Sequence, residues 1–435
     1  MKLRIPEGRF AVEVYRGNIV YAQSEEQLAE YEGYYITVDQ GIIQGVYPSL
    51  PQQYAGLPVT DFGDDVLIPA FSDLHVHAPQ YPQRGLAMDA LLPDWLQQYT
   101  FPLEAKYADI SFARQVYRAF VDDLIRHGTM HAVVFGTIHR EAASFLIDYM
   151  EEKELSAYVG KVNMDTGSPD ILCESTEGSL RETELFLQQH QGRRYAKPIL
   201  TPRFAPTCSR GLLEGLGKLA QKYHTGMQTH LVESGWEAKE ARRLFPDCSC
   251  DTQIYERAGL LENGPVVGAH FIFPEEEDIR ILKKYNGYAV QCPDATINIM
   301  AGIMQTAGLS RRGIMLGLGS DIAGGHCLGI FSQVARAVQL SKIKEFYEPE
   351  GNQAISFAQA FYMGTKQSGS LFGKVGSLEP GYSFDALVIG GLSDPFMSPG
   401  PAGIVERFCY TGGTEHIKAR YLHGKLCQPG IDDRR

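Results

Sequence analysis

Hydrophobic residues in the middle of the chain form short runs that alternate with segments of helical periodicity. Eight runs are apolar and rich in β-branched or small residues: 66–77, 130–137, 156–163, 198–204, 226–230, 265–270, 287–293 and 313–321. Segments with apolar residues three and four apart separate nearly all of them, for example 111–128, 211–224 and 275–287. Strands that alternate with helices are typical of parallel βα units. Eight such units predict an α/β fold with a closed (β/α)8 TIM-like barrel.

The two ends of the chain have a different pattern, in which short β-rich runs are separated by glycine turns. Such runs occupy residues 4–60 and return at 376–391 and 419–427. Similar patterns at both ends indicate one discontinuous domain with another domain inserted into it. We therefore expect residues 1–68 and 373–435 to form a composite β-sandwich, and residues 69–372 to form the barrel.

An open, doubly wound sheet is the competing fold for the middle of the chain. Dinucleotide-binding sheets of that class carry G-x-G-x-x-G directly after their first strand. The glycine-rich segment here, GLGSDIAGG at 317–325, has a different spacing and follows the last predicted strand. The pattern therefore favours the barrel.

Composition limits the partners and the compartment. The 435 residues include 40 basic and 52 acidic side chains, a net charge of −12, which disfavours nucleic acid and anionic membranes as partners. The first residues lack the apolar stretch of a signal peptide and no run is long enough to span a bilayer, so we expect a cytoplasmic protein. Eight scattered cysteines do not suggest a disulfide framework, and we expect Cys248 and Cys250 to be reduced surface thiols.

Ligand-type residues follow four of the predicted strands. The first ends on His75 and His77, the fifth on His230, the sixth on His270 and the eighth on Asp321. Catalytic residues of (β/α)8 barrels lie at this end of the strands, and residues i and i+2 of a strand share a face. A single His-x-His pair means little, but four of only 12 histidines lie at such positions. Together they predict a metal site.

The residue types narrow the choice of metal. Imidazoles with a carboxylate suit Zn²⁺, although Fe²⁺ or Mn²⁺ fits the same ligands. A second ion usually needs a bridging modified lysine at the end of the fourth strand, where this chain has Arg203 and Phe204. We therefore expect one ion per chain, whose function is to lower the pKa of a bound water.

Glu233 is the candidate for proton transfer, because it follows His230 by three residues in the same predicted loop. Its alternative role is structural, since acidic residues also suit the first turn of a helix. We favour proton transfer for Glu233 and a helix start for Glu237. The acidic run at 275–278 also predicts a helix start.

Several segments, in the expected order, resemble the amidohydrolase superfamily: LIPAFSDLHVH (67–77), THLVES (229–234), AHF (269–271), GLGSDIAGG (317–325) and GSLEPGYSFDALVI (376–389). Three others resemble the guanine deaminase family within it: HAPQY (77–81), LLPDWLQQYTFPLEAKYAD (91–109) and TPRFAPTCS (201–209). The resemblance covers essentially the whole chain. It implies zinc-dependent hydrolytic deamination of guanine to xanthine and ammonia, a reaction of purine catabolism or salvage, and a homodimer.

The resemblance also implies roles for individual residues. The implied zinc ligands are His75, His77, His230 and Asp321. Glu233 would be the proton shuttle, Asp321 would also orient the water, and His270 would polarise the attacked carbon or stabilise the tetrahedral intermediate.

The implied purine pocket consists of Gln80, Arg203 and Phe204: an amide, a fixed cation and an aromatic face. His270 would also contact the substrate. Trp95 either closes this pocket or packs beneath a loop.

One segment departs from the pattern of amidohydrolase deaminases, which commonly have His-Cys-Pro after the seventh strand. This chain has Gln291, Cys292 and Pro293 there, followed by Asp294, which would contact ring N–H groups or form a salt bridge. Two alternatives therefore stay open. One is deamination of another heterocycle, such as 8-oxoguanine, a pterin or an aminotriazine, and the other is a metal- or purine-binding protein without turnover. The nucleobase deaminases with a P-C-x-x-C site are excluded because the chain has no C-x-x-C.

Overall fold

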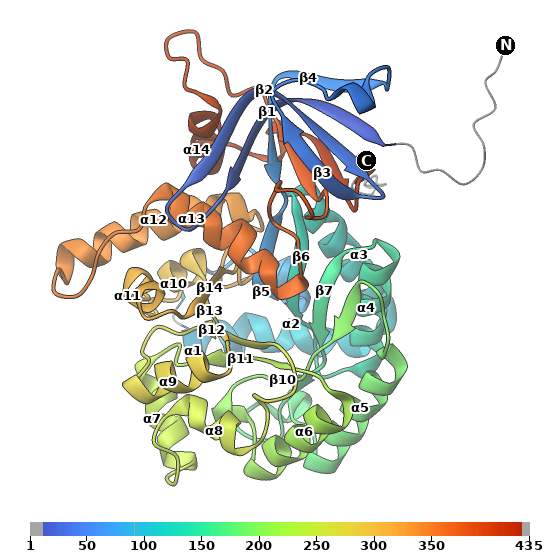
Figure 1. Ribbon diagram of the computed structural model, residues 1–435. Helices are drawn as coiled ribbons and strands as arrows, with labels where there is room; N and C mark the ends of the chain where they lie inside the picture. Colours follow the sequence, from blue (N-terminus) through green and yellow to red (C-terminus); the bar gives the residue numbers. More distant parts are fainter. Residues whose placement is uncertain (1–11, 91, 429–435) are drawn as a thin grey trace.

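The computed structural model describes residues 12–90 and 92–428, which form two parts (Figure 1). A twisted sheet at the top contains strands from both ends of the chain. Below it, parallel strands are surrounded by helices. The α/β class predicted for the middle of the chain is confirmed.

The parallel strands form two sheets of four strands and one pair. The first sheet has the order β5 (Phe71–His77), β6 (Thr129–Phe135), β7 (Ser156–Gly160) and β9 (Ala196–Pro198). The second has the order β11 (Met227–Leu231), β12 (Val266–His270), β13 (Tyr288–Gln291) and β14 (Met315–Leu318). The pair consists of β8 (Val162–Asn163) and β10 (Thr201–Pro202). Within the described residues the hydrogen-bond ladder is therefore not one continuous ring.

The ladder is interrupted at two places. Between β9 and β11, Pro198 and Pro202 have no N–H to donate, and a single bridge joins Leu200 to Met227. Between β14 and β5, two backbone bonds join β5 to the loop after β14: the N–H of Asp321 donates to the carbonyl of His75 at 2.9 Å, and the N–H of His77 donates to the carbonyl of Ile322 at 3.2 Å.

Several predicted strand boundaries are wrong. The run at 156–163 is divided at Lys161 into β7 and β8, and the strand in the run at 287–293 ends at Gln291. The run at 66–77 is divided at Ala70, and its first part belongs to β4 (Val59–Pro69) of the upper sheet. The fourth run ends at Pro202, so Arg203 follows the strand. The eighth strand ends at Leu318, and Asp321 lies in the loop after it.

The three helices predicted from periodicity are present. They are α3 (Ile110–Arg126), α6 (Arg210–Tyr223) and α9 (Glu276–Lys284). Asp109 caps α3 by accepting a hydrogen bond from the N–H of Ser111, at 2.8 Å. Glu275 and Asp278 form a capping box at the start of α9, which confirms the helix start predicted from this acidic run. The other helices of the lower part are α1 (Leu92–Trp95), α2 (Phe101–Ala105), α4 (Arg140–Glu152), α5 (Thr176–His190), α7 (Gly235–Leu244), α8 (Asp251–Arg257), α10 (Pro293–Asn298), α11 (Thr306–Arg311), α12 (Ile330–Tyr347) and α13 (Phe357–Tyr362).

The upper sheet has seven strands and contains both ends of the described chain. Its order is β17 (Lys425–Leu426), β16 (Ile417–Leu422), β15 (Ala386–Ile389), β4, β1 (Glu13–Ala22), β2 (Leu28–Asp39) and β3 (Ile42–Tyr47). Tyr15 stacks on Phe384 with ring centroids 4.8 Å apart, so residues far apart in sequence share one core. The short helix α14 (Pro401–Thr411) packs against β1, β2 and β4. The strands hydrogen-bond as one sheet, and the predicted β-sandwich stays a prediction.

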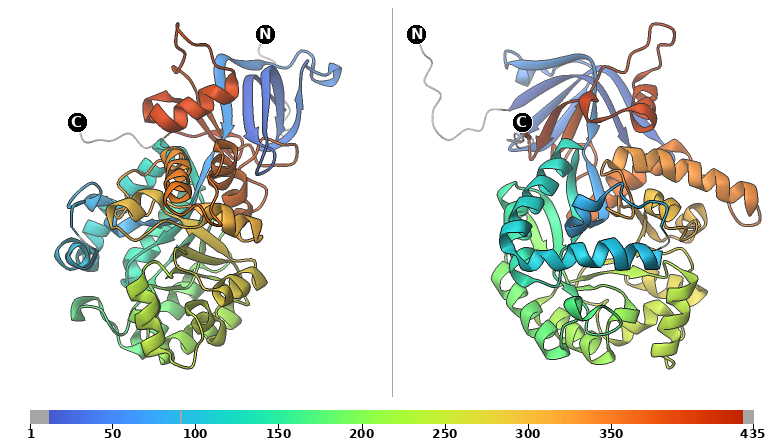
Figure 2. Two further views of the ribbon diagram at one scale, coloured as in Figure 1. Left: turned by 90° about the vertical axis from the view of Figure 1, so that its left-hand side faces the viewer. Right: turned by 180° about the vertical axis from the view of Figure 1, so that it is seen from behind.

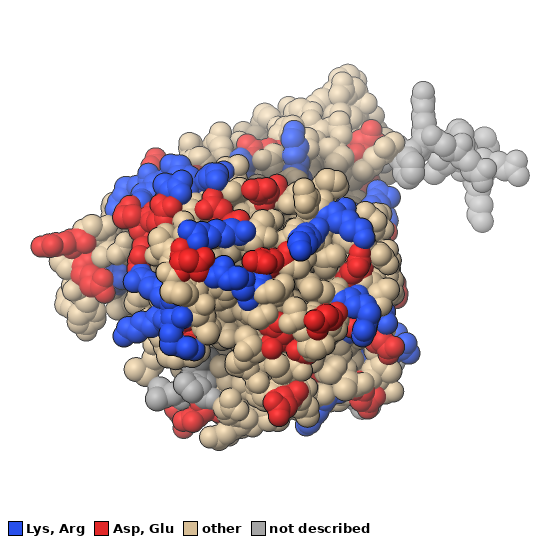
Figure 3. All heavy atoms as spheres, turned by 90° about the horizontal axis from the view of Figure 1, so that it is seen from below, with Lys and Arg blue, Asp and Glu red and all other residues tan. Residues whose placement is uncertain are grey.

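Surface charges of both signs are mixed on the face drawn in Figure 3. Basic side chains lie beside acidic ones there instead of forming a field of one sign. Within the part of the chain that the structure describes, no helix is both long and apolar enough to cross a membrane.

A buried polar network joins the upper sheet to the parallel strands. His131 of β6 lies with Nε2 3.1 Å from Asp385 Oδ2 and Nδ1 3.0 Å from Ser72 Oγ, and all three residues are fully buried. Asp385 also accepts hydrogen bonds from Ser383 Oγ at 2.9 Å and from the N–H of His423 at 2.6 Å. Burial alone would raise the pKa of Asp385, but the hydrogen bond from His131 and the charges of His131 and His423 lower it.

We predict that Asp385→Asn lowers the free energy of unfolding by about 3 kcal/mol at neutral pH, because it breaks a buried charged network. The folded-state pKa of Asp385 is lowered, so its stabilisation is complete above the pKa of an unfolded Asp, about 3.9, and is lost as pH falls through the folded pKa. The gap between wild type and variant should therefore shrink below about pH 4. Urea unfolding at several pH values measures both effects.

Glu276→Gln is the matched control, since Glu276 is exposed and pairs with Arg312 on the surface. We expect its unfolding midpoint to equal that of the wild type. An Asp385→Asn protein as stable as this control would show that the network does not hold the two parts together.

Candidate active site

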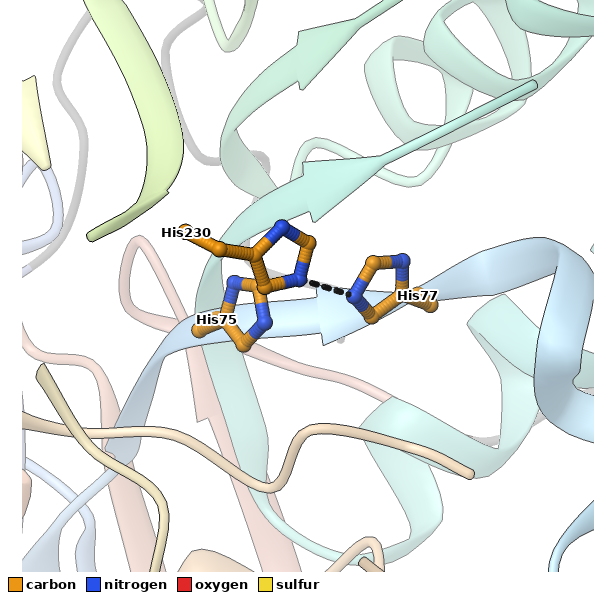
Figure 4. Close-up of side chains that lie close together, drawn as sticks. All are labelled: His75, His77 and His230. Atoms are coloured by element: carbon orange, nitrogen blue, oxygen red, sulfur yellow. Dashed lines mark hydrogen bonds between the residues drawn. The ribbon is translucent and has the colours of Figure 1, made fainter. Parts of the chain in front are cut away.

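Ligand-type side chains from three strands and one loop converge at one end of the parallel strands. His75 and His77 come from β5, His230 from β11, His270 from β12, and Asp321 from the loop after β14. Figure 4 shows the rings of His75, His77 and His230 close together, with the contact between His77 and His230 dashed. Each of these five residues is at most 8% exposed. The structure thus brings together the residues that the sequence predicts as a metal site.

The spacing of the donor atoms fits a tetrahedral metal ion. His77 Nε2 lies 3.1 Å from His230 Nε2, and Asp321 Oδ1 lies 3.2 Å from His75 Nε2 and 3.5 Å from His77 Nε2. Ligand atoms about 2.0–2.1 Å from a tetrahedral zinc are roughly 3.3 Å apart. His75 Nε2 is buried and has no hydrogen-bond partner among the described residues. These four side chains are therefore suited to hold a metal.

His230 is held in the tautomer that a metal ligand needs. Its Nδ1 lies 2.7 Å from the carbonyl oxygen of Arg203, so Nδ1 carries the hydrogen and Nε2 keeps its lone pair. Burial, and then the charges of neighbouring imidazoles, lower the pKa of both His77 and His230 well below the usual value. Both rings are therefore neutral near pH 7, as ligation requires.

Asp73 connects β5, which carries two of the ligands, to the loop after β14, which carries Asp321. Its Oδ1 accepts hydrogen bonds from the N–H of His75 and from the N–H of Ser320, each at 3.1 Å. Burial is the largest influence on Asp73 and raises its pKa to about 7 against the opposing hydrogen bonds. Gly319 permits this close approach, because a Cβ there would lie only 2.9 Å from His75 Cβ. Sequence reasoning missed Asp73, although it lies two residues before His75.

Glu233 and His270 lie beside the proposed ligands. His270 Nε2 is 3.6 Å from Glu233 Oε1 and 3.7 Å from Asp321 Oδ2. Burial, followed by the negative charge of Asp321, raises the pKa of Glu233 to about 8. Burial lowers the pKa of His270 to about 4. Near neutral pH the pair therefore offers a carboxyl group able to exchange a proton and a neutral imidazole.

The backbone at the site is strained. His270 and Asp321 have positive backbone φ angles of 74° and 46°, which residues other than glycine rarely adopt. Positions of this kind cluster where a fold holds functional side chains in fixed directions.

Glu237 lies in the first turn of α7, as predicted, and it also has a second role. It is 1% exposed, and its Oε2 accepts a hydrogen bond from the N–H of Glu233 at 2.7 Å. Ser234 supplies the actual cap of α7, where its Oγ accepts a hydrogen bond from the N–H of Glu237. The buried carboxyl of Glu237 thus fixes the backbone of Glu233.

A pocket of about 620 Å³, including open solvent at its mouth, lies over this group. All five residues predicted to contact the substrate line it: Gln80, Trp95, Arg203, Phe204 and His270. Trp95 is 4% exposed, and its indole N–H donates to the carbonyl of Leu86 at 3.4 Å, so it both faces the pocket and packs against a loop. Trp236 was not predicted from the sequence. Its ring centroid lies 6.3 Å from that of Phe204, and the residue is 61% exposed at the rim of the pocket.

The segment that departs from the family pattern does not contact the pocket. Asp294 is 1% exposed, forms a salt bridge with Arg336 and accepts a hydrogen bond from Gln333 Nε2 at 2.8 Å. Of the two roles considered for Asp294, the salt bridge is therefore correct.

Cys248 and Cys250 are free thiols as expected, but they are buried, not on the surface.

Comparison with known proteins agrees with this geometry. A model described as the Amidohydrolase family matches residues 66–426. The chain belongs to this family. Guanine deaminase from Dictyostelium discoideum is 33% identical over 380 residues, which cover 84% of this chain and 83% of that protein. Guanine deaminase from Homo sapiens is 30% identical over 385 residues, with 84% and 83% covered.

A solved structure gives the same relationship. The chain is similar to the crystal structure of guanine deaminase from C. acetobutylicum with bound guanine in the active site, with a TM-score of 0.93 and 38% identity. The match covers 96% of this chain and all of the other. The predicted resemblance to guanine deaminases of the amidohydrolase superfamily is confirmed. A metal-dependent hydrolase is the class that the family and the His/Asp group together establish.

We predict that His77→Ala weakens the binding of Zn²⁺, used as the test metal, by at least about 100-fold. Losing a residue that only hydrogen-bonds to a metal ligand already costs about 10- to 100-fold in affinity, and losing the ligand itself should cost more. Competition with a chromogenic chelator measures the dissociation constant. His326→Ala is the control, since His326 is partly exposed and bonds to Asn298 and Arg336 outside the proposed ligand group. Equal zinc affinity of His77→Ala and wild type would contradict the assignment.

Proposed function

We propose that this chain catalyses the zinc-dependent hydrolytic deamination of guanine to xanthine and ammonia. The observation that carries the proposal is the position of Glu233, a carboxyl group of raised pKa beside the His/Asp group and inside the purine-sized pocket. The 38% identity to a guanine deaminase with bound guanine supports the choice of substrate.

We assign the zinc ligands as His75, His77, His230 and Asp321, with one ion per chain. When bound, the ion would lower the pKa of a water molecule and polarise the attacked carbon. Asp73 holds His75 and the loop that carries Asp321 next to each other, because it accepts backbone hydrogen bonds from both segments.

Glu233 moves the proton in this mechanism. In its ionised form, which the charge of a bound metal ion would favour, Glu233 takes a proton from the water at Oε1 as the water oxygen bonds to the ring carbon that carries the amino group. The same carboxyl then gives this proton to the amino nitrogen, the C–N bond breaks, and ammonia leaves. Neutral His270, 3.6 Å from Glu233, donates a hydrogen bond to the charge that develops near the attacked carbon. Asp321 Oδ2 faces the same region and orients the water.

The distant part of the pocket holds the rest of the purine. Arg203 and the amide of Gln80 donate hydrogen bonds to its carbonyl oxygen and ring nitrogens. Phe204 offers an aromatic face, and Trp95 forms a wall of the pocket.

We also propose the larger architecture that the sequence predicts. Residues 69–372 form an eight-stranded barrel whose two parallel sheets meet at the Leu200–Met227 bridge and at the Asp73 junction. We assign residues 1–68 and 373–435 to the composite β-sandwich, of which 1–11 and 429–435 lie outside the described residues; the pairing of β15 with β4 supports this assignment.

We propose a homodimer as well. Its support is α12, which projects from the body in Figures 1 and 2 and ends in Phe346 and Tyr347, 78% and 76% exposed. We expect sedimentation equilibrium to give twice the chain mass of 48.3 kDa. A species of single-chain mass at micromolar concentration would contradict the dimer.

Incubation of the zinc-loaded protein with guanine is the test of the activity. We expect xanthine and ammonia in equal amounts, and turnover of guanine above that of 8-oxoguanine, aminated pterins and aminotriazines. A faster reaction with one of these other rings would overturn the substrate but keep the mechanism.

Glu233→Gln should lower kcat by about two to four orders of magnitude and leave zinc binding unchanged, because it removes only proton transfer. Glu240→Gln is the control, since Glu240 lies on the following helix α7 and pairs with Arg243 outside the pocket. A Glu233→Gln variant with wild-type turnover would remove Glu233 from the mechanism.

A further inference from the structure

Two polar residues of the pocket share one buried partner, Glu104 of helix α2. Glu104 Oε1 accepts hydrogen bonds from Gln80 Nε2 at 2.9 Å and from Arg203 Nη2 at 3.2 Å. Its Oε2 accepts a second bond from Arg203 Nη1 at 2.6 Å. The three residues are between 2% and 5% exposed. Gln80 and Arg203 line the pocket, whereas Glu104 lies behind them.

This contact fixes how Gln80 presents its amide. Gln80 Oε1 accepts a hydrogen bond from the N–H of Ala323 at 3.1 Å, while Nε2 donates to Glu104. A rotated amide would place N–H against N–H and oxygen against carboxylate. Only one orientation is therefore stable, and it leaves one amide N–H for a ligand.

The same contact neutralises Arg203. A guanidinium keeps its positive charge in proteins, and a buried cation needs a partner. The bidentate pair with Glu104 supplies this partner and still leaves N–H groups of Arg203 free to donate. Arg203 thus acts on a ligand as a hydrogen-bond donor within a neutral pair and not as a free cation.

We infer that Glu104 is a positioning residue that sets the charge of the pocket, so that Arg203 and Gln80 select a neutral oxopurine over an anionic one. This rests on the proposed function, in which the substrate is a neutral purine and the product xanthine ionises more readily. Glu104 then prevents xanthine, the product, from binding more tightly to Arg203 when xanthine ionises to its anion.

The experiment compares two purines that the enzyme cannot deaminate, hypoxanthine and xanthine, with the zinc-loaded protein. The pH is chosen so that xanthine is an anion and hypoxanthine is neutral. The chain has two tryptophans, Trp95 and Trp236, and both line the pocket, so tryptophan fluorescence reports binding without turnover.

We expect Glu104→Gln to raise the affinity for xanthine relative to hypoxanthine by about tenfold over the wild-type ratio, because it leaves Arg203 with an unbalanced charge. Arg203→Gln leaves the charge of Glu104 unbalanced and should shift the ratio in the opposite direction. The second variant keeps the inference testable if the first does not fold. Glu276→Gln, the same chemical change on the surface, should keep the wild-type ratio.

The outcomes separate this inference from the proposed function. Equal losses for both purines in the folded variants would mean that Glu104 has only a structural role, and would overturn the inference alone. A wild-type protein that binds neither purine would overturn the proposed function and the inference with it. Opposite shifts in the two variants would support both.

Discussion

Burial of several imidazoles beside one carboxylate is the constraint on which the site depends. Pairs of rings among His75, His77, His230 and His270 lie with centroids 4.9 to 5.4 Å apart, and they are packed out of water. Desolvation and the charges of neighbouring imidazoles lower the pKa of His77, His230 and His270, so these rings are neutral and the lone pairs of His77 and His230 are available for a metal. The backbone must hold them together against this cost. It does so through Asp73, Gly319 and the left-handed residues around the site.

Arg203 connects the metal group to the purine pocket. Its carbonyl oxygen orients the ring of His230, and its side chain faces the ligand from the bidentate contact with Glu104. Because one residue performs both tasks, the same piece of backbone would set the positions of the proposed metal and of the proposed purine. The break in the strand ladder at Pro202 directly precedes this residue.

Local patterns predict much of the fold and the centre of the site. Helical periodicity predicts α3, α6 and α9, and the metal site is predicted because His75, His77, His230, His270 and Asp321 all follow predicted strands. The ends of strands were less accurate, because prolines 198 and 202 and the loop after Leu318 stop the ladder while the apolar pattern continues.

The residues that sequence reasoning missed act through partners far away in the chain. Glu104 pairs with Arg203, 99 positions later, and Asp73 bonds to Ser320, 247 positions later. An acidic residue looks the same in a sequence whether it is solvated or paired with a buried group. Only the three-dimensional arrangement distinguishes the two. In the same way, the sequence predicts the place of Glu237 at a helix start but does not show its buried hydrogen bond to the N–H of Glu233.

Guanine turnover, measured together with metal content before chelation, after chelation and after zinc is restored, tests the zinc-dependent deamination most directly. We expect about one metal ion per chain, loss of xanthine formation when the ion is removed, and recovery with zinc. A protein that contains its metal and binds guanine but forms no xanthine would rule out the proposed function.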